Sequence, residues 1–328
     1  MPASPGPLSS PPDGPDERQA AVSIELHPLG PFRLDLTAWA LRRRARNRID
    51  IWDGDTYRRA LVVDGQPLAV EVTQLPRRRL STLTLTISGL PGTLSENRVA
   101  LARQVVETGL GLRVDLRPFY RLARRDPHLA GLVTRFRGLK PPRFPSLFEA
   151  LVNAVACQQL SLEVGITLLN RLTDAHGIAI AGVRPPLAAF PEPAALAVAF
   201  PADLRQLGFS NRKAETLVRL AVAVLDGSLD ELDLSSLPRA EASAALQGLS
   251  GIGRWSAEYA LLRGLGRLEV YPGDDVGARN KLRGFLGLSE PPDYATVNQL
   301  TAPWAPFQGM VYFHLLLQGL AERGTLAP

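Results

Sequence analysis

The sequence predicts a mainly α-helical protein that carries a smaller α+β domain at its amino terminus. Residues 82–89, TLTLTISG, alternate strictly between polar and apolar side chains, which is the period of a half-buried β-strand. From about residue 93 onward, apolar residues recur at helical spacing between short breaks that contain glycine or proline. A chain of 328 residues is long enough to bury a sizeable core in this arrangement.

Composition excludes several classes of protein. The apolar content of 45% is typical of a globular protein, and no apolar run is long enough to span a membrane. The single cysteine, Cys157, excludes an intrachain disulfide and a cysteine-ligated zinc or iron–sulfur cluster. The net charge is +5, and almost all of the positive charge comes from arginine. It is compatible with a polyanionic partner and equally with GC-rich coding, so composition leaves both explanations open.

The first 20 residues predict a disordered tail. They are rich in proline, serine and glycine and lack the apolar segment of a signal peptide. We therefore expect a cytoplasmic protein.

Residues 21–92 are expected to form the strand-rich amino-terminal domain. The alternating segments VSIEL (22–26) and FRLDL (32–36) predict strands, and a helix is expected over 36–47. Arginine clusters at 42–48 and 77–79 either contact DNA phosphates or form a solvated basic face. The solvated face is the commoner arrangement, and we favour it.

Residues 93–328 are expected to form the helical body. A helix is predicted to begin after Pro145–Ser146, because Ser146 is a good N-cap and apolar residues follow at helical spacing. Further helices are predicted over 162–174, 211–225, 238–247, 254–264, 276–286 and 305–322.

The segment GLSGIGRWSAEY (248–259) predicts a hairpin between two helices, within about 238–264. One helix ends near Gly248, the chain turns through Gly251–Ile252–Gly253, and the next helix begins at Arg254. The free N–H groups at a helix start make an anion site, although a glycine turn alone is weak evidence for one.

Two further pairs of residues have a structural and a functional interpretation. Trp255 and Tyr259 are four residues apart and share a helix face, as core residues or as a pocket wall. Asp274 and Asp275 precede a helix, where a carboxylate caps the helix and also stays ionised for use as a base or a charge stabiliser.

These segments together resemble the helix-hairpin-helix DNA glycosylase superfamily. LSGIGRWSAEYALLRGLG, followed by YPGDD, is similar to its hairpin and trailing aspartate. Within the superfamily the chain resembles the bacterial alkyladenine glycosylases of the 3-methyladenine DNA glycosylase II type. PSLFEALVNAVACQQLSL is similar to their wedge-bearing segment and WAPFQGMVYFHLLL to their final helix, so the resemblance runs over roughly residues 21–322.

The resemblance implies a catalytic role for Asp275 in the flipping and hydrolytic release of alkylated purines. It implies that Gln159 and Leu160 fill the gap left by the flipped nucleotide. The base pocket that it implies is lined by Trp255, Tyr259, Asp274 and Leu316. The phosphate contacts that it implies are made by Gly251, Gly253, Arg254 and Ser256.

The resemblance also implies partners and ions. The expected partner is double-stranded DNA that contains damaged bases, bound by a monomer. No cofactor is expected to be required, but a Na⁺ or K⁺ ion is implied at the main-chain carbonyls of Gln247, Leu249 and Ile252.

The sequence departs from the superfamily's pattern at two positions. Strand-cutting members carry a lysine where this chain has Trp255, so we expect hydrolysis without lyase activity. An aromatic pocket residue of the relatives is replaced by Leu316, two residues after His314. This change leaves open a glycosylase for deaminated or oxidised bases, and a non-catalytic protein that binds damaged DNA is the other alternative.

Overall fold

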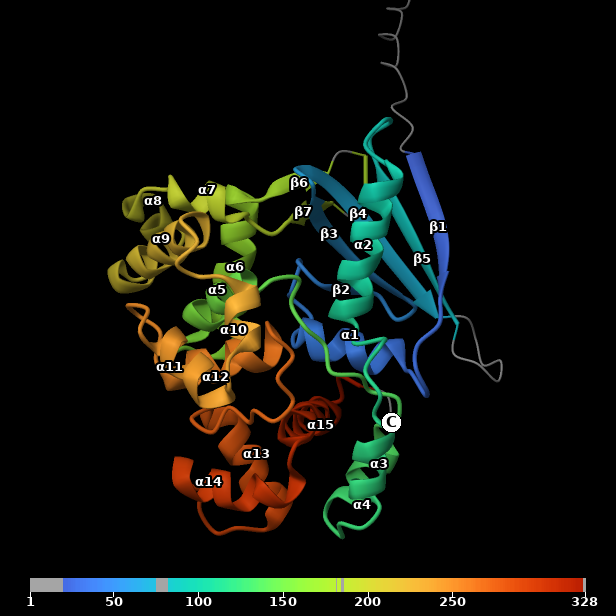
Figure 1. The fold of residues 1–328 in the computed structure, drawn as a ribbon, viewed down its shortest axis with the longest axis vertical. Coiled ribbons are helices and arrows are strands. Elements are labelled where there is room, and N and C mark those ends of the chain that lie inside the picture. The colour runs from blue at the N-terminus through green and yellow to red at the C-terminus, as the bar shows by residue number, and fades with distance from the viewer. Residues whose placement is uncertain (1–19, 75–81, 181, 184–185, 327–328) are drawn as a thin grey trace, which may run out of the picture.

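A computed structural model describes residues 20–74, 82–180, 182–183 and 186–326. An antiparallel sheet lies to one side of a large helical body (Figure 1), which confirms the predicted fold class. Residues 1–19 of the predicted tail and the arginines at 77–79 lie outside the described residues, and Ala20 belongs to a strand.

Five strands form the sheet, in the order β1-β5-β4-β3-β2. Their bounds are β1 Ala20–Leu26, β2 Ile51–Trp52, β3 Thr56–Val63, β4 Gln66–Gln74 and β5 Leu83–Gly89. The alternation in β5 is confirmed, since Leu83, Leu85 and Ile87 are buried and the residues between them are not. Helix α2 (Glu96–Gly109) packs against the sheet, and the core beneath the sheet continues to Leu112. The domain boundary at residue 92 stays a prediction.

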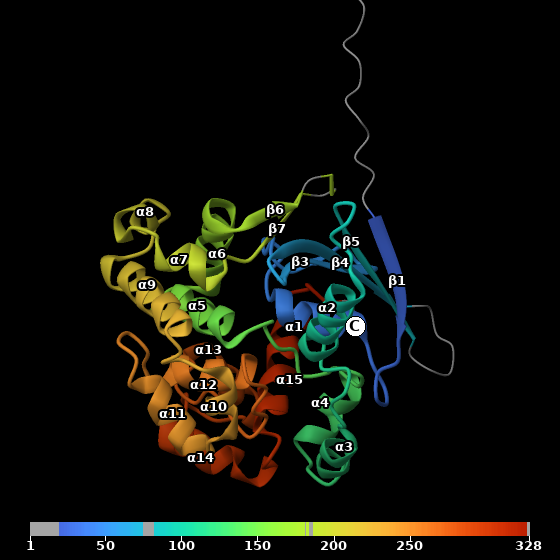
Figure 2. The same cartoon turned by 45° about the horizontal axis from the view of Figure 1, so that its top comes forward.

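Helix α1 (Leu34–Arg42) replaces the strand predicted for FRLDL, which was wrong. Leu34 and Ala38 face the core beneath the sheet, whereas Leu36 and Ala40 face the core of the helical body. A helix buried on both sides carries apolar residues at i and i+2, and over five residues this pattern is the same as that of a strand. Helix α1 lies between the sheet and the last helix, α15 (Gln308–Ala321), in both views (Figures 1 and 2).

The body is built around α5 (Leu147–Cys157), which is buried along almost its whole length. Ser146 caps α5 as predicted, because its Oγ accepts from the N–H of Glu149 at 3.1 Å. Helices α6, α9 and α12 contact α5 directly. Besides α5 and α15, the described helices of the body are α3 Arg117–Ala123, α4 Leu129–Arg135, α6 Leu162–His176, α7 Pro193–Ala197, α8 Pro201–Gln206, α9 Asn211–Leu225, α10 Glu231–Ser236, α11 Arg239–Gln247, α12 Arg254–Arg263, α13 Val276–Leu286 and α14 Tyr294–Thr301, with a 3₁₀ turn at Ala302–Trp304.

Two features join the sheet to the body. A small ribbon, β6 (Ile178–Ile180) with β7 (Leu187–Ala189), contacts β3 and β4. Arg59 on β3 donates to Asp50 at 2.7 Å and to Glu149 of α5 at 2.6 Å, and all three side chains are buried. Buried charges are stable only when they are paired, so this cluster fixes the sheet relative to α5. None of the described helices is both long and apolar enough to cross a membrane.

Candidate functional site

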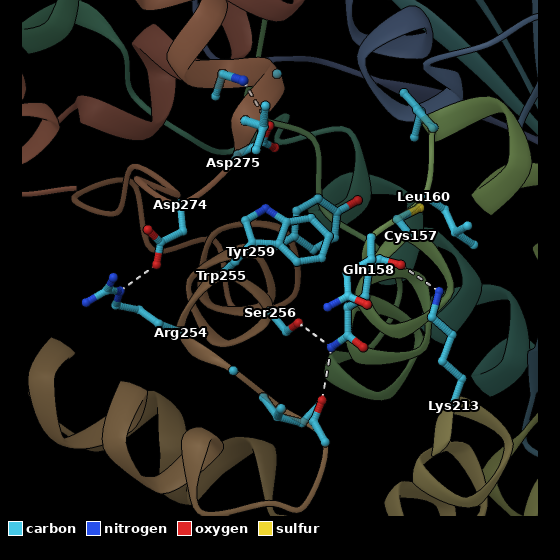
Figure 3. A pocket seen from close by; sticks show the side chains of 18 of the residues that line it. Cys157, Gln158, Leu160, Lys213, Arg254, Trp255, Ser256, Tyr259, Asp274 and Asp275 are labelled. Atoms are coloured by element: carbon cyan, nitrogen blue, oxygen red, sulfur yellow. Dashed lines mark hydrogen bonds and ion pairs between the residues drawn. The ribbon is translucent and has the colours of Figure 1, made fainter. Parts of the chain in front are cut away.

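A cavity of about 1110 Å³ lies where α5, α12, α13 and α15 converge. It brings together every site residue that the sequence predicted. These residues are Gln159, Leu160, Gln247, Leu249, Gly251, Ile252, Gly253, Arg254, Trp255, Ser256, Tyr259, Asp274, Asp275 and Leu316. Figure 3 shows Leu160, Trp255 and Asp275 among them.

Asp275 is held at the edge of this cavity by hydrogen bonds to both of its carboxylate oxygens. Oδ1 accepts from the N–H of Ala278 at 2.8 Å, which makes Asp275 the N-cap of α13. Oδ2 accepts from the hydroxyl of Tyr312 at 3.1 Å. The capping role predicted for Asp275 therefore leaves its carboxylate at the cavity.

Tyr312 is a cavity residue that the sequence reasoning missed. Burial, followed by the nearby Asp275 carboxylate, raises the pKa of Tyr312 well above the usual value. The phenol therefore stays protonated and donates a hydrogen bond to Asp275. Tyr312 precedes Leu316 by four residues on α15. Because residues i and i+4 share a helix face, this spacing was available as a signal.

Aromatic rings form one wall of the cavity. The rings of Trp255 and Tyr259 lie 5.5 Å apart between centroids and are inclined by 37°. Tyr259 is buried and Trp255 is half-buried. Leu316 lines the same cavity and presents an aliphatic side chain to it.

Arg43, which the sequence placed on a solvated basic face, is buried at the back of the cavity with 4% exposure. Its Nη1 donates to the Tyr259 hydroxyl and its Nη2 to Asn153 Oδ1, both at 2.7 Å. The solvated interpretation was therefore wrong for Arg43. Its neighbours Arg46 and Arg48 are exposed and pair with carboxylates of α6.

The loop after α5 presents the predicted wedge. Gln159 adopts a left-handed conformation with φ of 55°, and the Leu160 side chain is 44% exposed. Gln158 Nε2 donates to Gly251 O and to Ser256 Oγ, each at 2.9 Å, and so ties this loop to the hairpin. Lys213 Nζ donates to Gln158 O at 2.7 Å and to Ala156 O at 3.0 Å. Sequence reasoning missed Gln158 and Lys213 because their bonds join separate parts of the chain (Figure 3).

The hairpin places the start of α12 at the mouth of the cavity. Gly251 has φ of 93°, and a Cβ added there would lie 2.2 Å from Thr216 Oγ1, so the turn requires glycine. Gly253 is the N-cap of α12 and makes no side-chain cap. The side chain of Arg254 pairs with Asp274 at 2.6 Å and lies over the ring of Tyr294.

The lining of the cavity is strongly basic. Six basic side chains accompany two carboxylates, Asp274 and Asp275. The basic residues are Arg43, Arg44, Arg212, Lys213, Arg254 and Lys281. Such a lining favours a polyanionic partner. The described residues contain no cluster of three or more histidine, cysteine, aspartate or glutamate side chains that would hold a metal ion.

Comparison with known proteins finds similarity to DNA repair proteins. Residues 152–306 match the family described as HhH-GPD superfamily base excision DNA repair protein. The chain is 30% identical over 201 residues to a DNA-3-methyladenine glycosylase of Bacillus subtilis, a match that covers 61% of this chain and 66%, just under two thirds, of that protein. It is 28% identical over 284 residues to DNA-3-methyladenine glycosylase 2 of Escherichia coli, covering 84% of this chain and 90% of that protein.

A solved structure extends the likeness to the whole fold. The 3-methyladenine DNA glycosylase from Archaeoglobus fulgidus superposes with a TM-score of 0.77 at 25% identity. The superposition covers 93% of this chain and 100% of that one, so it includes the amino-terminal sheet as well as the helical body.

Proposed function

Because the chain belongs to the HhH-GPD superfamily of base excision DNA repair proteins, we propose that it is a monofunctional DNA glycosylase that releases alkylated purines. One observation carries the proposal: Asp275 faces, with both oxygens hydrogen-bonded, a cavity that is walled by Trp255 and Tyr259. The hairpin and the wedge loop border the same cavity, as DNA binding requires.

DNA is bound through its phosphates in this proposal. The uncapped start of α12 offers N–H groups to a phosphate beside the lesion, and the basic side chains of the lining add attraction that does not depend on sequence. The hairpin carbonyls of Gln247, Leu249 and Ile252 are oxygen donors of the kind that hold Na⁺ or K⁺. An ion there would add positive charge next to the phosphate and would take no part in bond cleavage.

A base within the duplex is out of reach of Asp275, so the damaged nucleotide has to be flipped into the cavity. Leu160 is exposed at the end of a loop fixed by Gln158, which suits it to fill the vacated space in the base stack. The flipped base then stacks on the aromatic wall.

Hydrolysis breaks the bond between C1′ of the sugar and the base nitrogen, and the electron pair of that bond leaves with the base. The sugar develops oxocarbenium character, which the Asp275 carboxylate stabilises. Water adds to C1′ and loses a proton, for which Asp275 is the acceptor at hand. A purine that alkylation has made cationic leaves as a neutral base, so no general acid is needed.

Lyase activity is not part of the proposal, because Trp255 occupies the position of the lysine that strand-cutting members carry. The purified protein should leave abasic DNA that breaks only after alkali or heat. Direct nicking by the wild type would overturn this point. A Lys281→Met variant would then show whether the lysine of the cavity lining is responsible.

The decisive experiment compares Asp275→Asn with wild type on duplexes that contain 3-methyladenine, 7-methylguanine, 1-methyladenine, ethenoadenine or hypoxanthine. Base release should be lost in Asp275→Asn while duplex binding, measured by fluorescence anisotropy, persists. Asp293→Asn is a matched control, because Asp293 caps α14 through the N–H of Thr296 at 2.8 Å and lies outside the cavity. A fully active Asp275→Asn protein would refute the catalytic assignment. DNA binding by a wild type that releases none of these bases would favour a non-catalytic damage-binding protein.

A further inference from the structure

The base pocket is closed at the back by a guanidinium that comes from outside the helical body. Arg43 follows α1 directly, with φ of 60°, and its side chain passes between Tyr259 of α12 and Asn153 of α5. Its carbon Cζ lies 5.5 Å from the centroid of the Phe144 ring. The aromatic wall of the pocket therefore has a fixed positive charge directly behind it.

This charge is not neutralised by a carboxylate contact. The hydrogen bonds of Arg43 go to a phenol and an amide, and among the described residues its Nε has no partner. A second guanidinium, that of Arg263, is fully buried beside the same Tyr259 ring and donates only to the Ala40 carbonyl among the described contacts. Burial of an unpaired charge is costly, and a fold tolerates it most readily where the charge has a task.

Other charges near the pocket cancel this field only in part. The buried carboxylates of Asp50 and Glu149 share a single guanidinium, that of Arg59, which leaves one negative charge against the two positive charges of Arg43 and Arg263. Lys281 adds positive charge to the lining. Burial raises the pKa of the Cys157 thiol, which keeps that side chain neutral. Two carboxylates line the cavity. Asp274 pairs with Arg254, and Asp275 is the one assigned to stabilise the charge of the reacting sugar.

The contact with Arg43 also determines whether the Tyr259 hydroxyl acts as a hydrogen-bond donor or acceptor toward a ligand. The phenol oxygen accepts from Nη1 of Arg43, so the hydroxyl hydrogen is left to point elsewhere. Tyr259 lines the cavity, and a lone pair on a bound base is the natural acceptor for this hydrogen. A hydroxyl polarised by a guanidinium is a stronger donor than a free one.

We propose that Arg43 is a specificity-determining residue that makes the pocket favour neutral purine lesions with a free acceptor edge, such as hypoxanthine or ethenoadenine, over cationic purines such as 7-methylguanine. The inference rests on the proposed glycosylase activity and shifts its preferred substrates from cationic toward neutral purine lesions. Leu316 acts in the same direction, because an aliphatic side chain provides no cation–π attraction for a charged base.

The test removes the charge of Arg43 and follows the ratio of two activities. Single-turnover release of hypoxanthine and of 7-methylguanine is measured on otherwise identical duplexes, and each rate is divided by the spontaneous rate of loss. Arg43→Gln should shift the ratio of these accelerations by about tenfold toward 7-methylguanine, the effect of one charge-assisted hydrogen bond. Arg46→Gln removes the same charge three residues away, outside the cavity, and should leave the ratio unchanged.

Tyr259→Phe tests the same inference without removing Arg43. It keeps the ring and removes the donor, so release of hypoxanthine should fall about tenfold further than release of 7-methylguanine does. This variant keeps the inference testable if Arg43→Gln proves unstable, and a melting temperature for each protein separates misfolding from altered selectivity.

The outcomes distinguish the two proposals. If the wild type releases no damaged base, the proposed function fails and the selectivity inference fails with it. If the wild type releases these bases but each variant changes the release rates of hypoxanthine and 7-methylguanine equally, Arg43 has only a structural role. In that case the selectivity inference alone is overturned.

Discussion

The hydroxyl of Tyr312 on α15 donates to Oδ2 of Asp275, at 3.1 Å, while the backbone of α13 holds Oδ1. Two helices that are separate in sequence thus fix one carboxylate. Its orientation toward the cavity depends on both of them.

Replacement of Tyr312 by Phe removes one of these restraints and leaves the buried ring in place. The carboxylate should rotate more freely, and we expect single-turnover base release to fall by about ten- to a hundredfold, the usual cost of losing a positioning contact. Duplex affinity should not change. Tyr294→Phe removes a hydroxyl that donates to Glu258 outside the cavity, and it should keep full activity. Equal losses of binding and release in Tyr312→Phe would contradict a positioning role.

The support of the wedge loop by Lys213 can be tested in the same manner. Lys213→Met loses two hydrogen bonds to the carbonyls at the end of α5, so Leu160 should be held less firmly. We expect weaker flipping, seen as a smaller fluorescence rise from 2-aminopurine placed beside the lesion. Arg219→Gln, an exposed change on the same helix, should give the wild-type signal. A normal signal from Lys213→Met would show that the loop holds its shape without this residue.

The hairpin turn is predicted to be intolerant of a side chain at Gly251. Alanine there meets both an unfavourable φ of 93° and the Thr216 hydroxyl at 2.2 Å. Gly227→Ala is the matched control, because its φ of 78° is also positive but no atom lies within 4 Å of the added Cβ. The control should lose about 1 kcal/mol in urea unfolding. The free energy of unfolding should fall further in Gly251→Ala, and this variant should also bind duplex DNA less tightly. Equal losses of stability in the two variants would contradict the argument from close packing.

His314 should make the fold sensitive to acid. Burial lowers its pKa from 6.5 to about 4, so the folded state binds this proton more weakly than the unfolded chain does. Stability from this residue is therefore present above pH 6.5 and is lost as the pH falls toward 4. The loss should amount to about 3 kcal/mol. Urea unfolding of wild type and His314→Gln between pH 7 and 4 measures it, with the exposed His27→Gln as control. Parallel curves for wild type and His314→Gln would assign the acid sensitivity to other groups.

Part of the candidate site was predictable from local sequence signals, because its residues lie on helices or in the short turns that begin and end them, whereas Gln159, Leu160 and Leu316 were assigned only through the family resemblance. The spacing of Trp255 and Tyr259, the cap at Asp275 and the glycine turn are local signals, and each lies in the cavity. The strand prediction for FRLDL was wrong because the apolar pattern of five residues does not distinguish a helix buried on both sides from a strand. Arg43 could not be recognised, since its burial depends on Tyr259, which lies 216 residues further along the chain.

The position of Arg43 has a consequence for how such enzymes diversify. Two residues of the amino-terminal part, Arg43 and Arg44, line a pocket whose other walls belong to the helical body. The two parts therefore cannot be exchanged as independent modules. On the proposed role of Arg43, a chimera that receives the first sixty residues of a relative would change its substrate preference through a segment that contains none of the proposed catalytic groups.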